Sequence, residues 1–322
     1  MREKIYRRKA EYFLNYFALL QMFLGVRVVL RLLRSMGGEQ ISTSEGATLA
    51  EEDKESVTVI IPVLNEYHRL SPCLHGLMMQ GRAIAEIVVV DGGSYDGTQE
   101  LVHTYEQQDP RVHLVDASPV PSDWNGKAWG LQVGLRSACP DTLWILTMDA
   151  DVRPQAHLVQ ALLTRAKREG LAALSIATLQ EIHGIGEGLL HPSFLTTLVY
   201  RFGIPGKIAH RVSEVQANGQ CFLFFREALE TCAGFADARH SLCEDVTMAR
   251  SLVARGYSFG FYEVGELAMV RMYQDWRDTW NNWARSLPMH DHFSGMSTLS
   301  GYLEIALIQA LPLPLFLSLV IG

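Results

Sequence analysis

The sequence predicts an α/β fold in which a mostly parallel sheet is covered by helices on both faces. Runs of consecutive apolar residues, such as 143–146, are typical of strands that are buried on both sides. Segments with helical periodicity separate these runs, and this alternation indicates parallel strands joined by crossover helices. With 322 residues, of which 48% are hydrophobic, the chain is long enough to bury a large core.

The expected elements can be placed along the chain from these patterns. Four apolar runs are the expected strands: 57–62, 85–91, 111–116 and 142–148. Four periodic segments are the expected helices: 65–80, 96–108, 126–137 and 246–255. We expect every acidic motif to lie at the carboxyl end of a strand, where open α/β sheets bind their ligands.

Charge is distributed unevenly along the chain. The net charge is −7, yet residues 1–34 hold eight Lys or Arg residues against two Glu, a balance of +6 that leaves −13 on the other 288 residues. The acidic body excludes nucleic acid as a partner, and the basic arm favours an anionic membrane surface. The five cysteines show no CxxC spacing, so we expect free thiols in a reducing compartment rather than a disulfide framework or a zinc site.

The apolar segment 12–33 is long enough to span a bilayer. Arg27, Arg31 and Arg34 recur at helical spacing within or beside it, and arginines are costly in hydrocarbon. This pattern favours an amphipathic helix lying in the membrane interface. A short span whose arginines reach the cytoplasmic side remains open.

Four regions are expected on this basis: a membrane-associated basic helix over 1–34, a polar linker over 35–56, a catalytic domain over 57–290 and a C-terminal membrane segment over 291–322. The apolar run 305–321 is about the minimum length for a span, which leaves open whether the chain ends inside an incomplete membrane segment. The apolar run 189–200 fits a core helix or a membrane-facing one.

Two polar turns follow the first two expected strands. Pro62, Asn65 and Glu66 follow the first strand, where backbone N–H groups and the Glu66 carboxylate would face the crevice of the sheet. An alternative role for Asn65 is to cap the next helix. The second turn begins with Asp91, Gly92 and Ser94, and its glycines allow close approach of the backbone to a ligand. Asp91 could accept a hydrogen bond from a nucleobase.

Two further motifs indicate a site for a diphosphate and a metal ion. Lys127 is expected at a helix N-terminus, where it could meet a diphosphate. Asp149 and Asp151 follow an apolar strand one residue apart, and such close like charges call for a cation. Mg²⁺ or Mn²⁺ bridging a diphosphate fits their oxygen ligands.

Glu244 and Asp245 precede the last expected helix. A carboxylate here could act as general base for an acceptor hydroxyl group. Capping of that helix by Asp245 is the structural alternative. The pair His290 and His292 suggests a metal cluster only weakly, because no further ligands have matching spacing.

The ordered set of motifs PVLNE, DGGSYDGT, DAD and CED resembles family 2 inverting glycosyltransferases, which have the GT-A fold. The resemblance covers about residues 57–290. It implies that Glu66 and Asp91 contact the nucleotide of a UDP- or GDP-sugar and that Asp149 lies near the ribose and diphosphate. It also implies that Asp151 holds the metal ion and that Asp245, with Glu244 beside it, is the base.

A narrower resemblance extends to the acceptor side. Trp124-Asn125-Gly126-Lys127, Asn218-Gly219-Gln220 and Arg271-Met272-Tyr273-Gln274, followed by a Trp-rich helix, resemble the carotenoid glycosyltransferases. The resemblance implies a carotenoid or other lipid acceptor at the cytoplasmic face of a membrane. The acceptor-side residues are then these five: Asn218, Gly219, Gln220, Trp276 and Arg277.

Several alternatives stay open. Residues 274–277 match the Gln-x-x-Arg-Trp motif of the processive branch only in part, so transfer of a single sugar is expected rather than polymer synthesis. Hopanoids, glycerolipids and polyprenyl phosphates are alternative acceptors. A nucleotidyltransferase shares the acidic sheet, but it needs a basic loop after the first strand, and residues 62–66 contain no Lys or Arg. The alternative that the protein is an inactive membrane scaffold is disfavoured, because its acidic motifs are intact.

Overall fold

The computed structural model describes residues 2–47, 53–54, 56–182, 184–273, 276–283 and 295–312. The chain divides into two compact units, which are treated separately: a larger one of residues 37–190 and 205–291, and a smaller one of residues 1–36, 191–204 and 292–322. The suggested His290 and His292 pair and most of the apolar segment 305–321 lie outside the described residues, as do Gln274 and Asp275.

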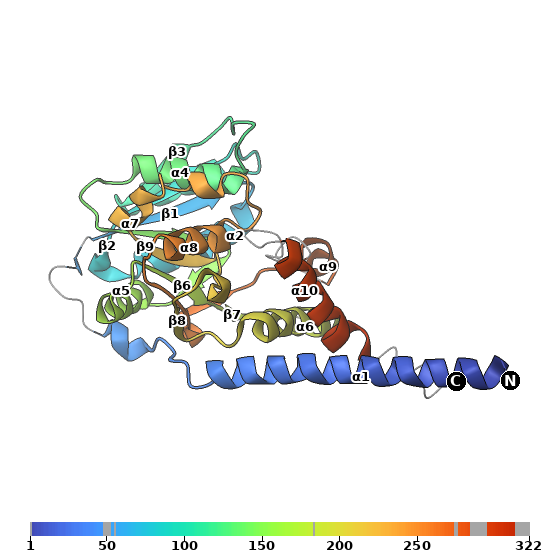
Figure 1. Cartoon of the computed structure of the whole chain (residues 1–322). Helices are drawn as coiled ribbons and strands as arrows, with labels where there is room; N and C mark the ends of the chain where they lie inside the picture. The colour runs from blue at the N-terminus through green and yellow to red at the C-terminus, as the bar shows by residue number, and fades with distance from the viewer. Residues whose placement is uncertain are drawn as a thin grey trace. The chain divides into compact units, whose positions relative to one another are not determined.

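An eight-stranded sheet forms the centre of the larger unit (Figure 1), with the strand order β3-β2-β1-β4-β9-β6-β10-β8. Its strands are β1 (Val57–Val63), β2 (Ile84–Asp91), β3 (Val112–Asp116), β4 (Trp144–Met148), β6 (Ala173–Ala177), β8 (Lys207–Ala209), β9 (Cys221–Phe225) and β10 (Phe259–Glu263). A second sheet has the order β5-β11-β7, with β5 (Val152–Pro154), β7 (Leu179–Gln180) and β11 (Ala268–Val270).

The direction of the strands changes in the middle of the large sheet. β1, β2, β3 and β4 are parallel, as are β6 and β10. β9 is antiparallel to both of its neighbours, β4 and β6, and β8 is antiparallel to β10. The predicted mostly parallel sheet is therefore confirmed, with β9 as an antiparallel insertion that hydrophobic runs alone do not reveal.

Helices cover both faces of this sheet, as predicted. α2 (Tyr67–Met78), α3 (Thr98–Glu106) and α5 (Leu158–Glu169) pack on one face, and α4 (Gly126–Ser137), α7 (Arg226–Thr231) and α8 (Glu244–Ala254) pack on the other. β1 shows how the faces are divided: Val59 and Ile61 join the first core and Ile60 joins the second. This alternation follows the two-residue repeat of a strand and fixes its register.

The eight expected elements are all confirmed in type, with small shifts at their ends. The predicted helix over 65–80 is too long at its start, because α2 begins only at Tyr67. Asn65 has a φ of +58° and does not cap the helix. The predicted helix over 126–137 matches α4 at both ends, since the Asn125 side chain caps it by accepting from the Lys127 N–H at 3.1 Å.

The expected linker contains an ordered anchor in its described part. The short 3₁₀ helix at Thr43–Gly46 packs on α5. The buried Arg165 of α5 donates to both carboxylate oxygens of Glu45 in the 3₁₀ helix, at 2.9 and 2.7 Å. Arg165 also donates to the Gln40 carbonyl at 3.0 Å. Residues 48–52 of the expected linker lie outside the described residues.

The smaller unit is helical. It contains α1 (Arg2–Ser35), the second part of α6 (Ile185–Phe202) and α10 (Gly295–Ile305), which continues as a π-helical turn over Ala306–Ala310. Among the described residues, Asn15–Ser35 is the one helical stretch long and apolar enough to cross a membrane, judged by length and composition. Its Arg31 pairs with Glu304 of α10 at 2.7 Å.

Candidate active site

Lys127 joins two acidic motifs that are far apart in the sequence. Its Nζ lies 2.7 Å from Asp149 Oδ1 and 2.7 Å from Glu244 Oε1. Burial lowers the pKa of Lys127, but the two carboxylates outweigh it and hold the pKa well above its usual value. The lysine is therefore charged, and it brings the start of α4, the end of β4 and the start of α8 to one point.

Asp151 has the features of a cation ligand. Its Oδ1 is buried and has no hydrogen-bond partner among the residues that the structure describes. Burial and the nearby charge of Asp149 raise the pKa of Asp151 to about 7. No group of three His, Cys, Asp or Glu side chains with metal-site geometry occurs in the described part of the chain. Any ion held here would therefore take further ligands from a substrate or from water.

Asp245 lies in the first turn of α8, beside the Lys127 ion pairs. Its Oδ1 accepts from the Val246 N–H at 2.8 Å. Burial and the charge of Glu244 raise the pKa of Asp245 to about 7, against the opposing effect of Lys127. The expectation that every acidic motif follows a strand is wrong here, because a 3₁₀ turn at Ala236–Ala238 precedes α8. The ion pair to Lys127, rather than the sheet, brings this motif to the site.

Asp91 organises the turn after β2. The side chain is fully buried, and its carboxylate accepts from the N–H groups of Gly93 and Ser94, at 3.0 and 2.9 Å, and from Gln99 Nε2 at 2.6 Å. A hydrogen bond from a nucleobase to this carboxylate would have to replace one of these contacts. Sequence patterns place an acidic residue at a strand end, but they do not show which groups already occupy it.

The turns after β1 and β2 are tied together. Asn65 N–H donates to Ser94 Oγ at 2.8 Å, and Asn65 Oδ1 accepts from the Tyr95 N–H at 3.0 Å. Gly92 N–H donates to the Val63 carbonyl at 2.9 Å, next to Pro62 near the end of β1. These bonds hold the two expected nucleotide-binding turns side by side.

Glu66 pairs with a residue that the sequence motifs did not identify. Arg69 Nε lies 2.7 Å from Glu66 Oε2, with the i,i+3 spacing of a helix. The Arg69 charge also acts on Asp149 and Asp151. Burial raises the pKa of Glu66 despite this arginine. The helical spacing was the one signal in the sequence that could have indicated Arg69.

The Asn218-Gly219-Gln220 segment lies against Lys127, Glu244 and Asp245. A Cβ atom on Gly219 would lie 3.0 Å from Glu244 Oε1, 3.2 Å from Lys127 Nζ and 3.3 Å from Asp245 Cβ. Gln220 holds the acidic loop through its carbonyl, which accepts from the Asp149 N–H at 3.0 Å. The Asn218 N–H donates to Ser175 Oγ at 2.8 Å, and the same hydroxyl group donates to the Asn218 carbonyl at 2.9 Å. The expected acceptor segment is thus fixed beside the acidic groups.

Trp276 and Arg277 begin α9 (Trp276–Trp283). The Trp276 side chain packs against Gly186 at the start of α6, where a Cβ atom would meet it at 2.7 Å, and the Arg277 guanidinium lies 5.4 Å from the Trp276 ring. Trp276 and Trp280 are exposed, together with Ile185 and Leu189 of α6. Trp276 therefore joins the start of α9 to the start of α6, where these apolar side chains are exposed, and Arg277 lies beside its ring.

A sheet of this order, with acidic side chains and a lysine gathered beyond its strands, defines a glycosyltransferase of the GT-A fold class. The pattern of glycosyl transferase family 2 matches residues 58–232, more than half of the chain. The chain belongs to this family. The match confirms the resemblance that the ordered motifs indicated.

Two curated relatives come from staphylococci. A 4,4'-diaponeurosporenoate glycosyltransferase of Staphylococcus aureus (strain USA300) is 24% identical over 223 residues, which is 69% of this chain and 57% of the relative. The enzyme of the same name from Staphylococcus haemolyticus (strain JCSC1435) is 28% identical over 149 residues, 46% of this chain and 38% of the relative. This chain therefore matches 57% of the length of the first of these relatives and 38% of the length of the second.

Solved structures share the fold. A mannosyltransferase from Pyrobaculum calidifontis, in complex with GDP-Man and Mn²⁺, superimposes with a TM-score of 0.62 at 18% identity, covering 92% of this chain and 80% of that chain. Glucosyl-3-phosphoglycerate synthase from Mycobacterium tuberculosis, in complex with Mg²⁺ and UDP, has a TM-score of 0.50 at 18% identity, covering 82% and 84%. These likenesses support the fold alone.

Proposed function

We propose that this protein transfers one sugar from a nucleotide-sugar donor to a hydroxyl group of a membrane lipid, with a carotenoid as the acceptor. The observation that carries the proposal is the pair of ion contacts from Lys127 to Asp149 and Glu244, because it joins the donor motif to the base motif. The names of the staphylococcal relatives support the carotenoid class.

The donor would bind across the turns after β1, β2 and β4. Glu66 and the turn of Asp91 would face the nucleotide, and Asp149 would lie near the ribose. Lys127 would meet the diphosphate as a point charge, exchanging one of its carboxylate partners for a phosphate oxygen. UDP-sugars and GDP-sugars both suit this arrangement, and structural neighbours were solved with UDP or GDP-Man.

Asp151 would hold a divalent cation, Mg²⁺ or Mn²⁺. Its buried, unpartnered oxygen and its raised pKa fit a site where the charges of Arg69 and Lys127 offset burial and the Asp149 charge only in part. Hard cations of this kind prefer carboxylate, phosphate and water oxygens. When bound, the ion would neutralise the charge that develops on the departing diphosphate.

Asp245 would act as the base. Its carboxylate removes the proton of the acceptor hydroxyl group while the hydroxyl oxygen attacks the anomeric carbon of the donor. The bond from that carbon to the diphosphate breaks, and the nucleoside diphosphate leaves with the electron pair, so the configuration inverts. A pKa of about 7 makes Asp245 an effective proton acceptor near neutral pH. Glu244 would keep Lys127 in place.

The acceptor would enter along apolar surface. The backbone of Gly219 packs closely beside Asp245, and the exposed Trp276 and Trp280 offer an aromatic face for a lipid. Arg277 lies over the Trp276 ring and would orient this face. The apolar α1 supports residence at a membrane, and we assign the active site to its cytoplasmic face. The partial match of residues 274–277 to the Gln-x-x-Arg-Trp motif of the processive branch favours one transfer over polymer synthesis.

Mass spectrometry of lipid extracts from cells with and without the gene tests the acceptor. The proposal predicts a carotenoid species heavier by one hexose or deoxyhexose only when the gene is present. If a glycosylated hopanoid, glycerolipid or polyprenyl phosphate appears instead, that lipid and not a carotenoid is the acceptor. No new glycolipid, together with no donor hydrolysis by the purified protein and Mn²⁺, would support the scaffold alternative instead.

A further inference from the structure

The smaller unit carries an excess of positive charge in an apolar setting. Over residues 15–36, 191–204 and 292–322, the sequence has four arginines and a single acidic residue, Glu304. The arginines are Arg27, Arg31, Arg34 and Arg201. The unit therefore carries more positive than negative charge among apolar residues, and an anionic ligand would be attracted to it.

Three of the arginines gather around Glu304 of α10: Arg27 and Arg31 come from α1, and Arg201 comes from α6. Arg31 donates to both carboxylate oxygens, at 2.7 and 3.4 Å, and Arg27 Nη2 lies 3.7 Å from Glu304 Oε2. The Arg201 guanidinium lies beside Gly301, one turn before Glu304, where a Cβ atom would be 3.2 Å from its Cζ. Arg201 also interacts electrostatically with Arg31 and Glu304.

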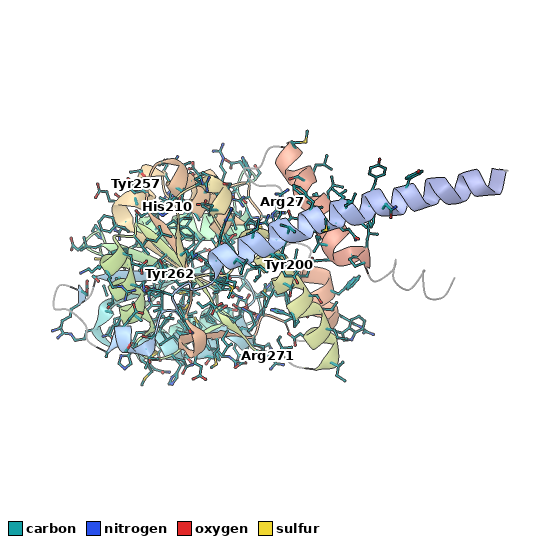
Figure 2. The ribbon with its side chains drawn as sticks, turned by 60° about the horizontal axis from the view of Figure 1, so that its bottom comes forward. Arg27, Tyr200, His210, Tyr257, Tyr262 and Arg271 are labelled. Atoms are coloured by element: carbon teal, nitrogen blue, oxygen red, sulfur yellow. The ribbon has the colours of Figure 1, made fainter. Side chains whose placement is uncertain are left out.

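This arginine cluster, made of Arg27, Arg31, Arg201 and Glu304, has a formal charge of +2. Arg31 is held in place, since one of its Nη atoms also donates to the Tyr200 carbonyl (Arg27 and Tyr200 are labelled in Figure 2). Arg27 keeps about half of its side chain exposed and makes the long contact to Glu304. One guanidinium is therefore committed to Glu304, while Arg27 presents charge to the surroundings.

Apolar side chains surround the cluster on the helix surface. Phe23, Val26 and Leu30 of α1 are 60%, 52% and 46% exposed, and Leu303 of α10 is 52% exposed. No charged residue occurs over residues 12–26. These 15 residues give about 22 Å of helix, more than the half-thickness of a bilayer's hydrocarbon core. The first arginine of the cluster, Arg27, thus directly follows an uncharged stretch that is long enough to reach past the middle of the hydrocarbon core.

We infer that the arginine cluster binds the phosphate group of a membrane lipid, whose acyl chains lie along the exposed apolar surface of α1 and α10. Guanidinium groups match phosphate oxygens in geometry and charge. A free phosphate ion would use the charges but leave the adjoining apolar surface exposed to water, which is why a lipid fits better. The inference concerns the helical unit and does not depend on which sugar acceptor the enzyme uses.

Native mass spectrometry of the full-length protein in detergent tests this site, because micelles lack the diffuse surface potential of a bilayer. The protein is incubated with phosphatidylglycerol or with phosphatidylcholine, and the bound lipid is counted. Arg27→Gln and Arg201→Gln remove charges from the cluster. Arg34→Gln is the matched control, since it removes an arginine from the same helix as Arg27 outside the cluster. Far-UV circular dichroism verifies that each variant keeps its helices.

We expect the wild type to retain one phosphatidylglycerol in preference to phosphatidylcholine. Arg27→Gln and Arg201→Gln should weaken this retention about tenfold, as expected for a lost charge-assisted hydrogen bond, while Arg34→Gln retains the wild-type level. Equal retention of the two lipids, or equal losses in all three variants, would overturn the inference. Competition by inorganic phosphate at matched ionic strength would show a free-phosphate site instead. None of these measurements requires sugar transfer, so failure here leaves the proposed function untouched.

Discussion

At the scale of single residues, Lys127 holds the site together. One ammonium group contacts Asp149 and Glu244, each at 2.7 Å, and lies near Gly219. Without that positive charge, the Asp149 and Glu244 carboxylates would repel each other. The lysine therefore both assembles the site and, in our proposal, receives the diphosphate of the donor.

Replacing Lys127 with Gln should raise the Kd for the nucleotide-sugar about tenfold or more, since a charge-assisted contact to the diphosphate is lost. Isothermal titration of UDP-sugars and GDP-sugars in the presence of Mn²⁺ measures this. Arg136→Gln is the control, because Arg136 is an exposed cation in the last turn of the same helix α4. Unchanged donor affinity in Lys127→Gln would exclude the lysine from the donor site.

The pKa of Asp245 predicts how activity depends on pH. A base must be deprotonated, and burial together with the Glu244 charge raises the pKa of Asp245 to about 7. We expect kcat/KM to fall as the pH drops below about 7 and to level off above it. Glu244→Gln removes a like charge, so it should move this transition to lower pH. A profile that stays in place or moves to higher pH in Glu244→Gln would contradict the electrostatic account.

At the scale of elements, the 218–220 segment shows how close packing shapes the site. Gly219→Ala would place a Cβ atom 3.0 Å from Glu244 Oε1 and 3.3 Å from Asp245 Cβ, so the carboxylates must shift. A displaced base lowers turnover, and we expect kcat to drop on the order of tenfold to a hundredfold. Gly188→Ala serves as control, because its Cβ would meet only Ile182 at 3.8 Å. Equal turnover of the two variants would show that the segment does not position the base.

The anchor between the 3₁₀ helix at Thr43–Gly46 and α5 predicts an effect on stability. Arg165 is buried and pairs with Glu45, so Arg165→Met removes the buried and closest cationic partner of this carboxylate. The free energy of unfolding should fall by about 3–5 kcal/mol in urea denaturation. Arg168→Met removes an exposed partner of the same Glu45 and should cost less than about 1 kcal/mol. Similar losses in both variants would mean that burial of Arg165 is unimportant.

At the scale of the whole molecule, the sequence was sufficient for the first four strands of the large sheet, for four of the helices and for the family. Apolar runs and glycine-rich turns are local signals, and they located β1, β2 and β4 with their acidic ends. Pairing between distant segments is not local. The antiparallel insertion of β9, the contact of Lys127 with Glu244 and the arginine cluster around Glu304 each join residues that the chain separates widely.

The same limit explains the differences at the site. Asp91 lies where the sequence placed it, but its carboxylate is already occupied by the turn that it forms. Asp245 belongs to a motif that follows no strand, so the rule of strand ends could not locate it. The ionic contacts of Lys127, and not the sheet alone, bring the residues of the candidate active site together.

The central claim is that Asp245 deprotonates the acceptor at a donor site built around Lys127 and Asp151. Its most direct test is Asp245→Asn, an isosteric change that removes the base, with the exposed Asp141→Asn as control. Mass spectrometry measures the glycosylated lipid formed by purified protein from the labelled donor and Mn²⁺, and titration measures donor affinity. We predict that Asp245→Asn lowers kcat by roughly 10²–10⁴ with an unchanged donor Kd, whereas Asp141→Asn matches the wild type. Near-normal turnover in Asp245→Asn would contradict the account.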